Sequence, residues 1–306
     1  MRSAAFGIIP DIARSFRPGI PLEIFRRMCR VVYFEQGLIE AVKEKLINKV
    51  VYLSTGQEAI PAAMSPLLSD FMIFAQHRCH AAYLAFGGDP VKMRDELLGL
   101  PSGTSRGRAG SNCFQCRQKG VTMIGHHGLI GENVPLGVGA ALGSGKPVLC
   151  FFGDGAAEED YVFSAMGFAA THKLPVFFVC EDNNLSILTP QSVRRSWSMT
   201  KVAAAFGMPA VEITDDPWTV YERTRELKTR LPAFMNIHTC RKYWHNYIGI
   251  DGPPDWDRFR IVKDELNELG LAAGAKKIEN EVKAAMKKVW ELKPLRKLLT
   301  KRPEST

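Results

Sequence analysis

Long apolar runs are absent from this sequence, and no stretch approaches the length of a membrane-spanning helix. The first residues, MRSAAFGIIPDIARSF, also lack the long apolar core and the cleavage site of a signal peptide. These two absences argue against membrane-spanning and secreted classes. We therefore expect a cytoplasmic protein with no membrane partner.

The sequence has no cluster of cysteines, and its most basic segment has little aromatic content. The seven cysteines, an odd number in 306 residues, are scattered along the chain, which argues against a dense disulfide framework and favours reduced thiols. The formal net charge is +8, but much of the excess lies between residues 276 and 302, where Trp290 is the single aromatic residue. We expect a solvated basic helix face there and no nucleic-acid partner.

What is present is enough for one large α/β domain, because 46% of the residues are hydrophobic and a chain of this length can bury a full core. The expected organisation is an N-terminal arm (1–20), an α/β domain (21–255) and a C-terminal helical tail (256–306). Spacing of apolar residues predicts helices and strands that alternate. The expected helices are 21–46, 201–206, 218–230 and most of 257–299, and the expected strands include 209–213 and 233–239.

The central stretch is VLCFFGDGAAEEDYVFSAMGFAATHKLPVFFVCEDNN, residues 148–184. A fully apolar run at 148–152 predicts a buried strand that ends at Gly153-Asp154-Gly155, and a helical pattern then continues to Pro175. A second buried strand follows at 176–180. This strand–helix–strand unit predicts a doubly wound α/β fold with a mostly parallel sheet.

Hard oxygen ligands stand beyond both strands of this unit. Ligands bind beyond the carboxyl ends of parallel strands, so Asp154 and Asn183 are expected to meet at one edge of the sheet. Together with a carbonyl near Leu185 they can supply half of the octahedral oxygen shell of Mg²⁺. The amides of Gly155 and Ala156 are expected to open the helix and to face phosphate groups. Each piece alone is also a common turn or loop.

The combination GDGAAEED and FAATHKLPVFFVCEDNN resembles the alpha subunit of the thiamine diphosphate-dependent 2-oxo acid dehydrogenases, which include the pyruvate, branched-chain and acetoin enzymes. The resemblance implies the thiamine diphosphate-binding fold and two cofactors, thiamine diphosphate and Mg²⁺. It implies that Asp154, Asn183 and the Leu185 carbonyl are the metal ligands. Gly155 and Ala156 are then the diphosphate contacts.

The resemblance also implies an activity and a partner. The expected function is decarboxylation of a 2-oxo acid with acyl transfer to a lipoyl group or another acceptor. A separate beta subunit is expected to carry the glutamate that activates the cofactor. The chain should therefore be inactive alone and assemble as an α2β2 heterotetramer.

Flanking motifs add further candidate residues. Polar residues at a strand end, Gln76 to His80, are solvated or hold an anion, and arginine offers a planar donor fork for phosphate. By resemblance His77 and Arg78 are diphosphate contacts, and His80 is a second-layer or substrate-side group with a catalytic role. A GQEA segment, which here includes Gln57, commonly occurs near the subunit interface and active site in that family.

Two later loops carry the other candidates. Gly128 and Ile130 match positions that contact the aminopyrimidine ring through backbone. His126 and His127 depart from that pattern, and we expect His127 to contact substrate. His245 follows a strand end and falls where the family has a loop histidine over the diphosphate, and a histidine there can bond phosphate or donate a proton near neutral pH.

Departures from the family leave alternatives open. Residues 101–127 are expected to form a long loop in which Asn112 and Cys113 replace the usual Met and His; Cys113 and Cys116 form a lone C-x-x-C pair that favours free thiols over zinc. Glu158 and Asp160 place extra negative charge near the diphosphate. The chain could instead be the cofactor-binding half of a split transketolase-like enzyme, or a non-catalytic scaffold subunit.

Overall fold

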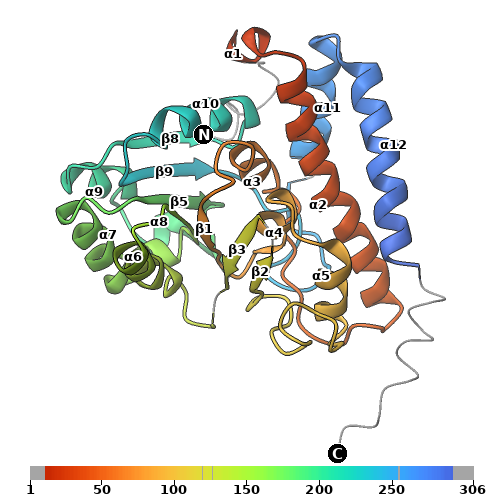
Figure 1. Ribbon diagram of the computed structural model, residues 1–306, viewed down its shortest axis with the longest axis horizontal. Coiled ribbons are helices and arrows are strands. Elements are labelled where there is room, and N and C mark those ends of the chain that lie inside the picture. The colour runs from red at the N-terminus through yellow and green to blue at the C-terminus, as the bar shows by residue number, and fades with distance from the viewer. Residues whose placement is uncertain (1–10, 119, 126, 254–255, 292–306) are drawn as a thin grey trace, which may run out of the picture.

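A seven-stranded sheet forms the centre of the computed structural model, which describes residues 11–118, 120–125, 127–253 and 256–291. All neighbouring strands are parallel except the first pair, β2 and β3, which is antiparallel. This confirms the expected doubly wound, mostly parallel α/β architecture (Figure 1). In spatial order the strands are β2 (Cys116–Gln118), β3 (Val121–Ile124), β1 (Met72–Phe74), β4 (Val148–Gly153), β5 (Val176–Asp182), β9 (Ala233–His238) and β8 (Ala210–Thr214).

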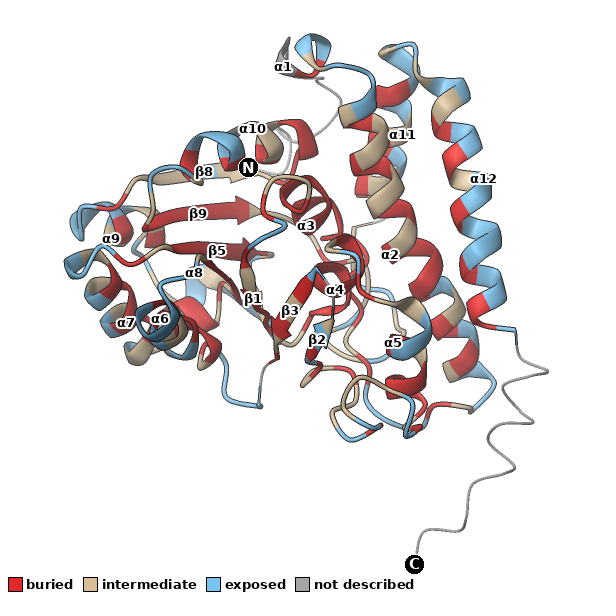
Figure 2. Ribbon diagram, viewed as in Figure 1, coloured by how far each residue is buried: buried red, intermediate tan, exposed pale blue. Residues whose placement is uncertain are grey.

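The central strands are buried on both faces, which explains their unbroken apolar sequences. In β4, Cys150 and Phe152 belong to the hydrophobic cluster on one face, whereas Leu149 and Phe151 belong to the cluster on the other. Figure 2 shows the sheet buried between two layers of helices. One layer contains α6 (Asn133–Ser144), α7 (Asp160–Thr171) and α9 (Met199–Ala205).

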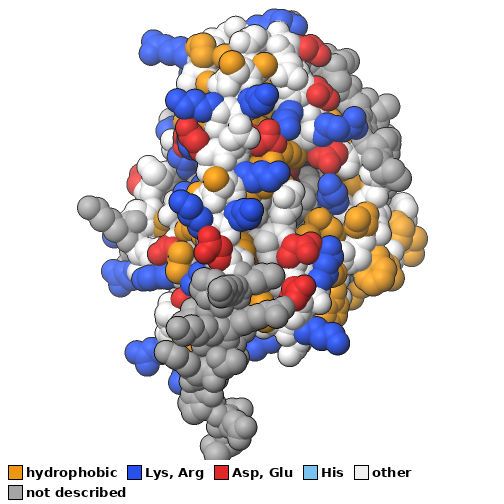
Figure 3. Space-filling model, turned by 90° about the vertical axis from the view of Figure 1, so that its right-hand side faces the viewer, with side chains coloured by type: hydrophobic (Ala, Val, Ile, Leu, Met, Phe, Trp, Pro, Cys, Tyr) orange, Lys and Arg blue, Asp and Glu red, His pale blue; other side chains and the backbone are white. Residues whose placement is uncertain are grey.

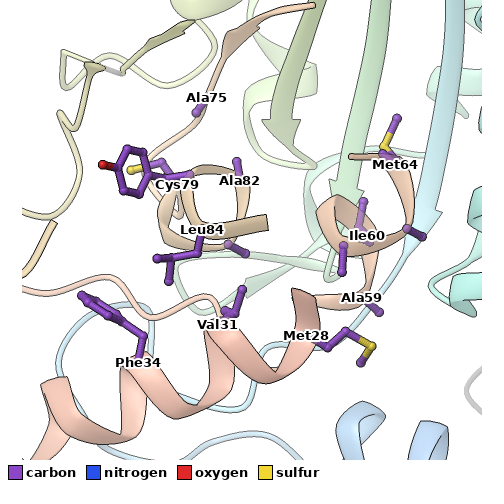
Figure 4. Close-up of a cluster of buried hydrophobic side chains, with 14 of the residues drawn as sticks. Met28, Val31, Phe34, Ala59, Ile60, Met64, Ala75, Cys79, Ala82 and Leu84 are labelled. Atoms are coloured by element: carbon purple, nitrogen blue, oxygen red, sulfur yellow. The ribbon is translucent and has the colours of Figure 1, made fainter. Parts of the chain in front are cut away.

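The opposite layer is larger and is built on one long helix, α2 (Gly19–Lys43). Figure 4 shows Met28, Val31 and Phe34 of this helix pointing toward side chains of α3 and α4. All three are fully buried, and each such side chain stabilises the fold by about 1.5–3 kcal/mol. The elements of this layer are α3 (Ala59–Met64), α4 (His80–Ala85), α5 (Pro90–Leu97), α10 (Pro217–Leu227), α11 (Arg258–Glu268) and α12 (Ala272–Val289).

The C-terminal helices pack on α2 and share its hydrophobic cluster. Trp290, at the end of α12, lies directly over Gly37, where a Cβ atom would come within 2.2 Å of the indole. The outer face of α12 exposes lysines, and Figure 3 shows Lys and Arg side chains mixed with Asp and Glu on this side of the molecule. A solvated basic helix face is confirmed for α12, whereas residues 1–10 of the expected arm and 292–306 of the expected tail lie outside the described residues.

The expectation of a structureless loop over 101–127 is wrong in its second half, because β2 and β3 form an antiparallel hairpin there. These strands have only three and four residues, CRQ and VTMI, and such short segments give too little periodicity to be predicted as strands. In the part of the chain that the structure describes, no helix is both long enough and apolar enough to cross a membrane.

The first half of the same segment is held by one buried carboxylate, Glu96 of α5. Its two oxygens accept hydrogen bonds from the backbone N–H groups of Ser105 (2.7 Å), Gly107 (2.9 Å), Ala109 (2.7 Å) and Gly110 (3.4 Å). Charged acceptors make stronger hydrogen bonds than neutral ones. A single side chain therefore replaces the secondary structure that this loop lacks.

Glu96→Gln is expected to lower the free energy of unfolding by about 2–3 kcal/mol, because an amide NH₂ would face backbone N–H donors inside the protein. Urea unfolding measures the loss, and limited proteolysis between residues 101 and 110 should become faster. Glu40→Gln is the control, since Glu40 is exposed and pairs only with Lys43 on the surface. Equal stability of the two variants would contradict this role of Glu96.

Candidate functional site

The candidate site is a pocket of about 160 Å³ beyond the carboxyl ends of β1, β4 and β5. The chain runs from β1 to β3 on one side and returns to β4 on the other, so the strand order reverses at β1 and β4. Open α/β sheets bind ligands at such a reversal point. The structure brings together residues from five separate segments; those lining the pocket include Gln76, His77, Arg78, Ile130, Asp154, Gly155, Ala156, Asn183, Leu185 and His245.

Asp154 follows β4 and is almost completely buried. Burial, and then the nearby Asp182 carboxylate, raise the pKa of Asp154 to about 6, although Arg194 and Arg195 oppose this shift. Its carboxylate accepts a hydrogen bond from Arg194, which also pairs with Glu158. A buried carboxylate held by a cation is a suitable position for a metal ligand.

Asn183 follows β5 and is oriented by local hydrogen bonds. Its Oδ1 accepts from the backbone N–H of Leu185 (3.1 Å), and its Nδ2 donates to Oε1 of Gln57 (3.2 Å). The next residue, Asn184, has φ of 65° and donates its backbone N–H to Asp182 (3.0 Å), a left-handed turn that asparagine tolerates. An amide oxygen has two lone pairs, so Oδ1 of Asn183 retains one for a cation.

Gly155 and Ala156 line the pocket, but they do not open the long helix directly as expected. A short 3₁₀ helix (Ala156–Glu158) comes first, the backbone becomes extended at Glu159, and α7 starts at Asp160. Gly155 is required at its position because a Cβ atom would lie 2.7 Å from Oγ of Ser186. The backbone of this loop is therefore close to the pocket. The N-terminus of the long helix α7 lies further along the chain, at Asp160.

Cationic and aromatic side chains form a second group of residues at the pocket. Arg78 is buried and donates to the carbonyls of Leu53 (3.0 Å) and His245 (2.9 Å). Burial and the neighbouring Arg241 lower the pKa of Arg78 to about 10, which leaves it charged at neutral pH. The rings of His77 and His245 are 5.3 Å apart and both pack edge-on against Tyr52. The charged Arg78 and the two histidines suit an anion, whereas the Asp154 carboxylate suits a cation.

His245 is partly buried and lies close to two arginines. Burial, and then the charges of Arg78 and Arg241, lower its pKa to about 4 from an ordinary value of 6.5. The expected proton donation near neutral pH is therefore not available to His245 until an anion enters the pocket and offsets these positive charges.

The pH dependence of stability should report this shift. Between the ordinary pKa and the lowered one, the unfolded chain binds a proton at His245 that the folded chain does not bind, so the free energy of unfolding should fall as the pH falls through this window. Comparing urea unfolding at about pH 7 and about pH 5 measures the effect, and His245→Gln should make the decrease smaller. An unchanged pH dependence in His245→Gln would contradict the lowered pKa.

His80, another expected site residue, does not line the pocket. His80 is fully buried between Glu35 (Nδ1 to Oε1, 2.9 Å) and Ser111 (2.9 Å), so the structure does not bring it to the pocket as a catalytic contact. Glu35 on α2 also accepts hydrogen bonds from the backbone N–H groups of Ser54 and Thr55, so it connects His80 to the segment that precedes Gln57.

The loop between β3 and α6 contributes only in part. Ile130 lines the pocket, whereas Gly128 does not, and both are exposed. His127 is exposed, with its side chain 64% accessible, and lies 3.4 Å from Glu132. The structure does not bring His127 into the pocket, and His126 lies outside the described residues.

Several residues at the site were missed in the sequence. Arg241 pairs with Asp251 (2.7 Å), Arg194 at the end of helix α8 (Gln191–Arg194) pairs with the Asp154 carboxylate, and Arg195 donates to the Asp154 carbonyl. An arginine pair shortly after the Asn183 loop was the only available signal. The partner of each arginine depends on how the loop folds back.

We next consider whether protein side chains are arranged to bind a metal ion. Within the described residues no group of three or more His, Cys, Asp or Glu side chains is arranged to hold a metal ion. Cys113 and Cys116 are both free thiols. One carboxylate and one amide at the pocket fit a cation that takes its other ligands from carbonyls, water and phosphate, as Mg²⁺ does.

The fold and pocket together define a class of protein: a doubly wound α/β subunit with an anion-and-cation pocket where the strand order reverses. Among solved structures the fold is similar to transketolase from Leishmania mexicana, with a TM-score of 0.54 and 16% identity over 92% of this chain and 47% of that chain. At this identity the likeness concerns the fold alone.

Sequence comparison identifies the family. The model of the dehydrogenase E1 component family matches residues 26–252. The alpha subunit of acetoin:2,6-dichlorophenolindophenol oxidoreductase from Cupriavidus necator is 32% identical, covering 82% of this chain and 80% of that protein. The chain belongs to the dehydrogenase E1 component family, which its resemblance to the alpha subunits of 2-oxo acid dehydrogenases predicted.

Other relatives are longer. Pyruvate dehydrogenase E1 component subunit alpha-1 from Oryza sativa is 36% identical over 57% of this chain and 46% of its own length. The alpha subunit from Zymomonas mobilis is 33% identical over 63% of this chain and 56% of its own length. The chain thus aligns with about half the length of these relatives.

Proposed function

We propose that this chain is the diphosphate- and Mg²⁺-binding alpha subunit of a thiamine diphosphate-dependent enzyme that decarboxylates a 2-oxo acid and transfers the acyl group. One observation carries the proposal: Asp154, Asn183, Arg78 and His245 line a single pocket. Membership of the dehydrogenase E1 component family supports it. So do the alpha subunits of pyruvate and acetoin enzymes among the relatives.

One set of pocket residues binds the metal in this proposal, and another set binds the diphosphate. Asp154, Oδ1 of Asn183 and the Leu185 carbonyl hold Mg²⁺. His77, Arg78 and His245 bind diphosphate oxygens, and the backbone at Gly155 and Ala156 approaches them closely. The neutral imidazole of His245 can donate one N–H, and an anion beside it raises its affinity for a proton.

Bound thiamine diphosphate supplies the electron sink that accepts the pair left by departing carbon dioxide. This chain's residues orient the cofactor and neutralise the charge of its diphosphate. Gln57 fixes the amide of Asn183, and His80 fixes Glu35, which holds the segment before Gln57. His80 is thus proposed as a positioning residue.

A partner subunit completes the site. The pocket of about 160 Å³ is below the usual size of a whole cofactor site. We propose a beta subunit that covers the remaining cofactor, supplies the activating glutamate and assembles with this chain as α2β2. Ile130 and the loop with Gly128 and His127 lie on the exposed side where such a partner and the substrate would approach.

Calorimetric titration of the full chain with thiamine diphosphate in Mg²⁺ tests binding, and co-purification with a beta-type chain tests assembly. The assembled enzyme should consume 2-oxo acids from a panel and transfer the acyl group to a lipoyl group or another acceptor. Activity on ketose phosphates would instead favour the split transketolase-like alternative. Absence of cofactor binding by the assembled complex would favour a scaffold subunit and contradict the proposal.

A further inference from the structure

Arg194 is placed where it interferes with the cation site. Its guanidinium donates hydrogen bonds to Oδ2 of Asp154 and to Oε1 of Glu158. The side chains of Arg194 and Asp154 are only 12% and 2% exposed, so water screens this pair little. The carboxylate that would bind a divalent cation is thus already paired with a cation belonging to the chain.

The neighbouring residue, Arg195, contacts the same loop in a different way. It donates to the main-chain carbonyl of Asp154 (3.0 Å) and lies 3.5 Å from Oε1 of Glu158, but it does not contact the Asp154 carboxylate. Its guanidinium stacks 4.8 Å from the ring centre of Trp197. Arg195 therefore anchors the segment through backbone, carboxylate and aromatic contacts that a cation at Asp154 would leave in place.

Glu158 gives Arg194 a second partner. A guanidinium has five N–H donors, so Arg194 can keep its bond to Glu158 when it leaves Asp154. Glu158 is also one of the two acidic residues that depart from the family pattern, and its extra negative charge is balanced here by two arginines. Glu158 is therefore a second acceptor for the guanidinium of Arg194.

We infer that Arg194 is a built-in competitor for the cation site: it neutralises Asp154 in the metal-free chain, and a divalent cation displaces it onto Glu158. This inference rests on the proposed function, because it takes Asp154 as a metal ligand. A guanidinium and a divalent cation repel each other on one carboxylate, so the apparent metal affinity falls by the fraction of time that Arg194 holds Asp154. Arg194 and Glu158 together set how tightly the site binds its metal.

Mn²⁺ binding to the full chain, followed by electron paramagnetic resonance with thiamine diphosphate held constant, tests the inference without any activity measurement. Arg194→Gln should bind Mn²⁺ about tenfold more tightly than the unmodified chain. Arg194→Lys keeps the charge but lacks the planar fork of the guanidinium, and it should give a smaller gain. Arg195→Gln is the matched control, because it removes the same charge nearby without vacating the Asp154 carboxylate.

A double-mutant cycle then measures how the effect of Glu158 on Mn²⁺ affinity depends on Arg194. Glu158→Gln should weaken Mn²⁺ binding in the unmodified chain, because Arg194 loses its alternative partner and stays on Asp154. In the Arg194→Gln background the same substitution should have little effect. A persistent effect of Glu158→Gln in that background would show that simple charge, and not displacement of Arg194, governs affinity.

The remaining outcomes separate this inference from the proposed function. Unchanged or weaker Mn²⁺ binding by Arg194→Gln, or equal gains for Arg194→Gln and Arg195→Gln, would overturn the inference while the metal site stands. No Mn²⁺ binding by the unmodified chain and by Arg194→Gln would contradict the metal site itself, and the inference with it. Circular dichroism of each variant verifies that the fold is retained.

Discussion

Asp154→Ala is expected to abolish binding of thiamine diphosphate with Mg²⁺, with a loss of affinity of at least about 100-fold, or about 2.8 kcal/mol. The physical reason is that Asp154 is the only carboxylate lining the pocket within the described residues. The second ligand, Asn183, is an uncharged amide. Without Asp154 the pocket keeps its cationic wall but has no charge to attract the metal.

Calorimetry with Mg²⁺ and thiamine diphosphate measures this loss. Asp160→Ala is the matched control, since it removes the same charge six positions away, where Asp160 is exposed and bonds only the backbone N–H of Tyr161. The Asp154→Ala chain should remain folded, because Arg194 keeps Glu158 as a partner. Cofactor affinity within about threefold of the unmodified chain would place the metal elsewhere and contradict the proposed site.

Arg258→Leu is expected to lower the free energy of unfolding by about 3–5 kcal/mol, because it leaves a buried carboxylate without its cation. Arg258 of α11 donates two hydrogen bonds to Oδ1 of Asp215, at 2.6 and 3.1 Å, and both side chains are fully buried. Asp215 also accepts from Thr239 (2.7 Å), at the end of β9. This pair joins the C-terminal helices to the strand that leads into the His245 loop.

Urea unfolding measures the change in stability, and two further variants interpret it. Arg258→Leu combined with Asp215→Leu removes both charges and should recover most of the loss, since apolar replacements of buried pairs are often tolerated. Arg225→Ala breaks an exposed pair with Glu222 and should cost less than about 1 kcal/mol. A loss in Arg258→Leu no larger than that of Arg225→Ala would contradict a structural role for the buried pair.

The central sheet and the convergence of Asp154 with Asn183 could be predicted from the sequence. Unbroken apolar runs at 148–152 and 176–180 and the helical pattern between them are local features, and parallel strands place their carboxyl ends on the same edge of a sheet. The pocket lining contains both side chains. Local periodicity was therefore sufficient for the half of the site that lies on these two strands.

The hairpin β2–β3 and the burial of His80 could not be predicted in this way. The hairpin has short, mixed strands that pair with each other, and its existence depends on the adjoining parallel strand β1. His80 is buried with its Nδ1 2.9 Å from the carboxylate of Glu35, which lies 45 positions earlier on α2. Contacts between distant segments leave no periodic pattern in the sequence.

By itself the sequence determined a doubly wound α/β chain of the dehydrogenase E1 component family and the two strand ends that carry Asp154 and Asn183. Only the tertiary structure decided which groups contact those residues, Arg194 on Asp154 and Gln57 on Asn183, and that burial together with two nearby arginines lowers the pKa of His245. The reason is that strand direction follows from local chain geometry, whereas the partner of a charged side chain follows from how separate loops fold back over the sheet edge.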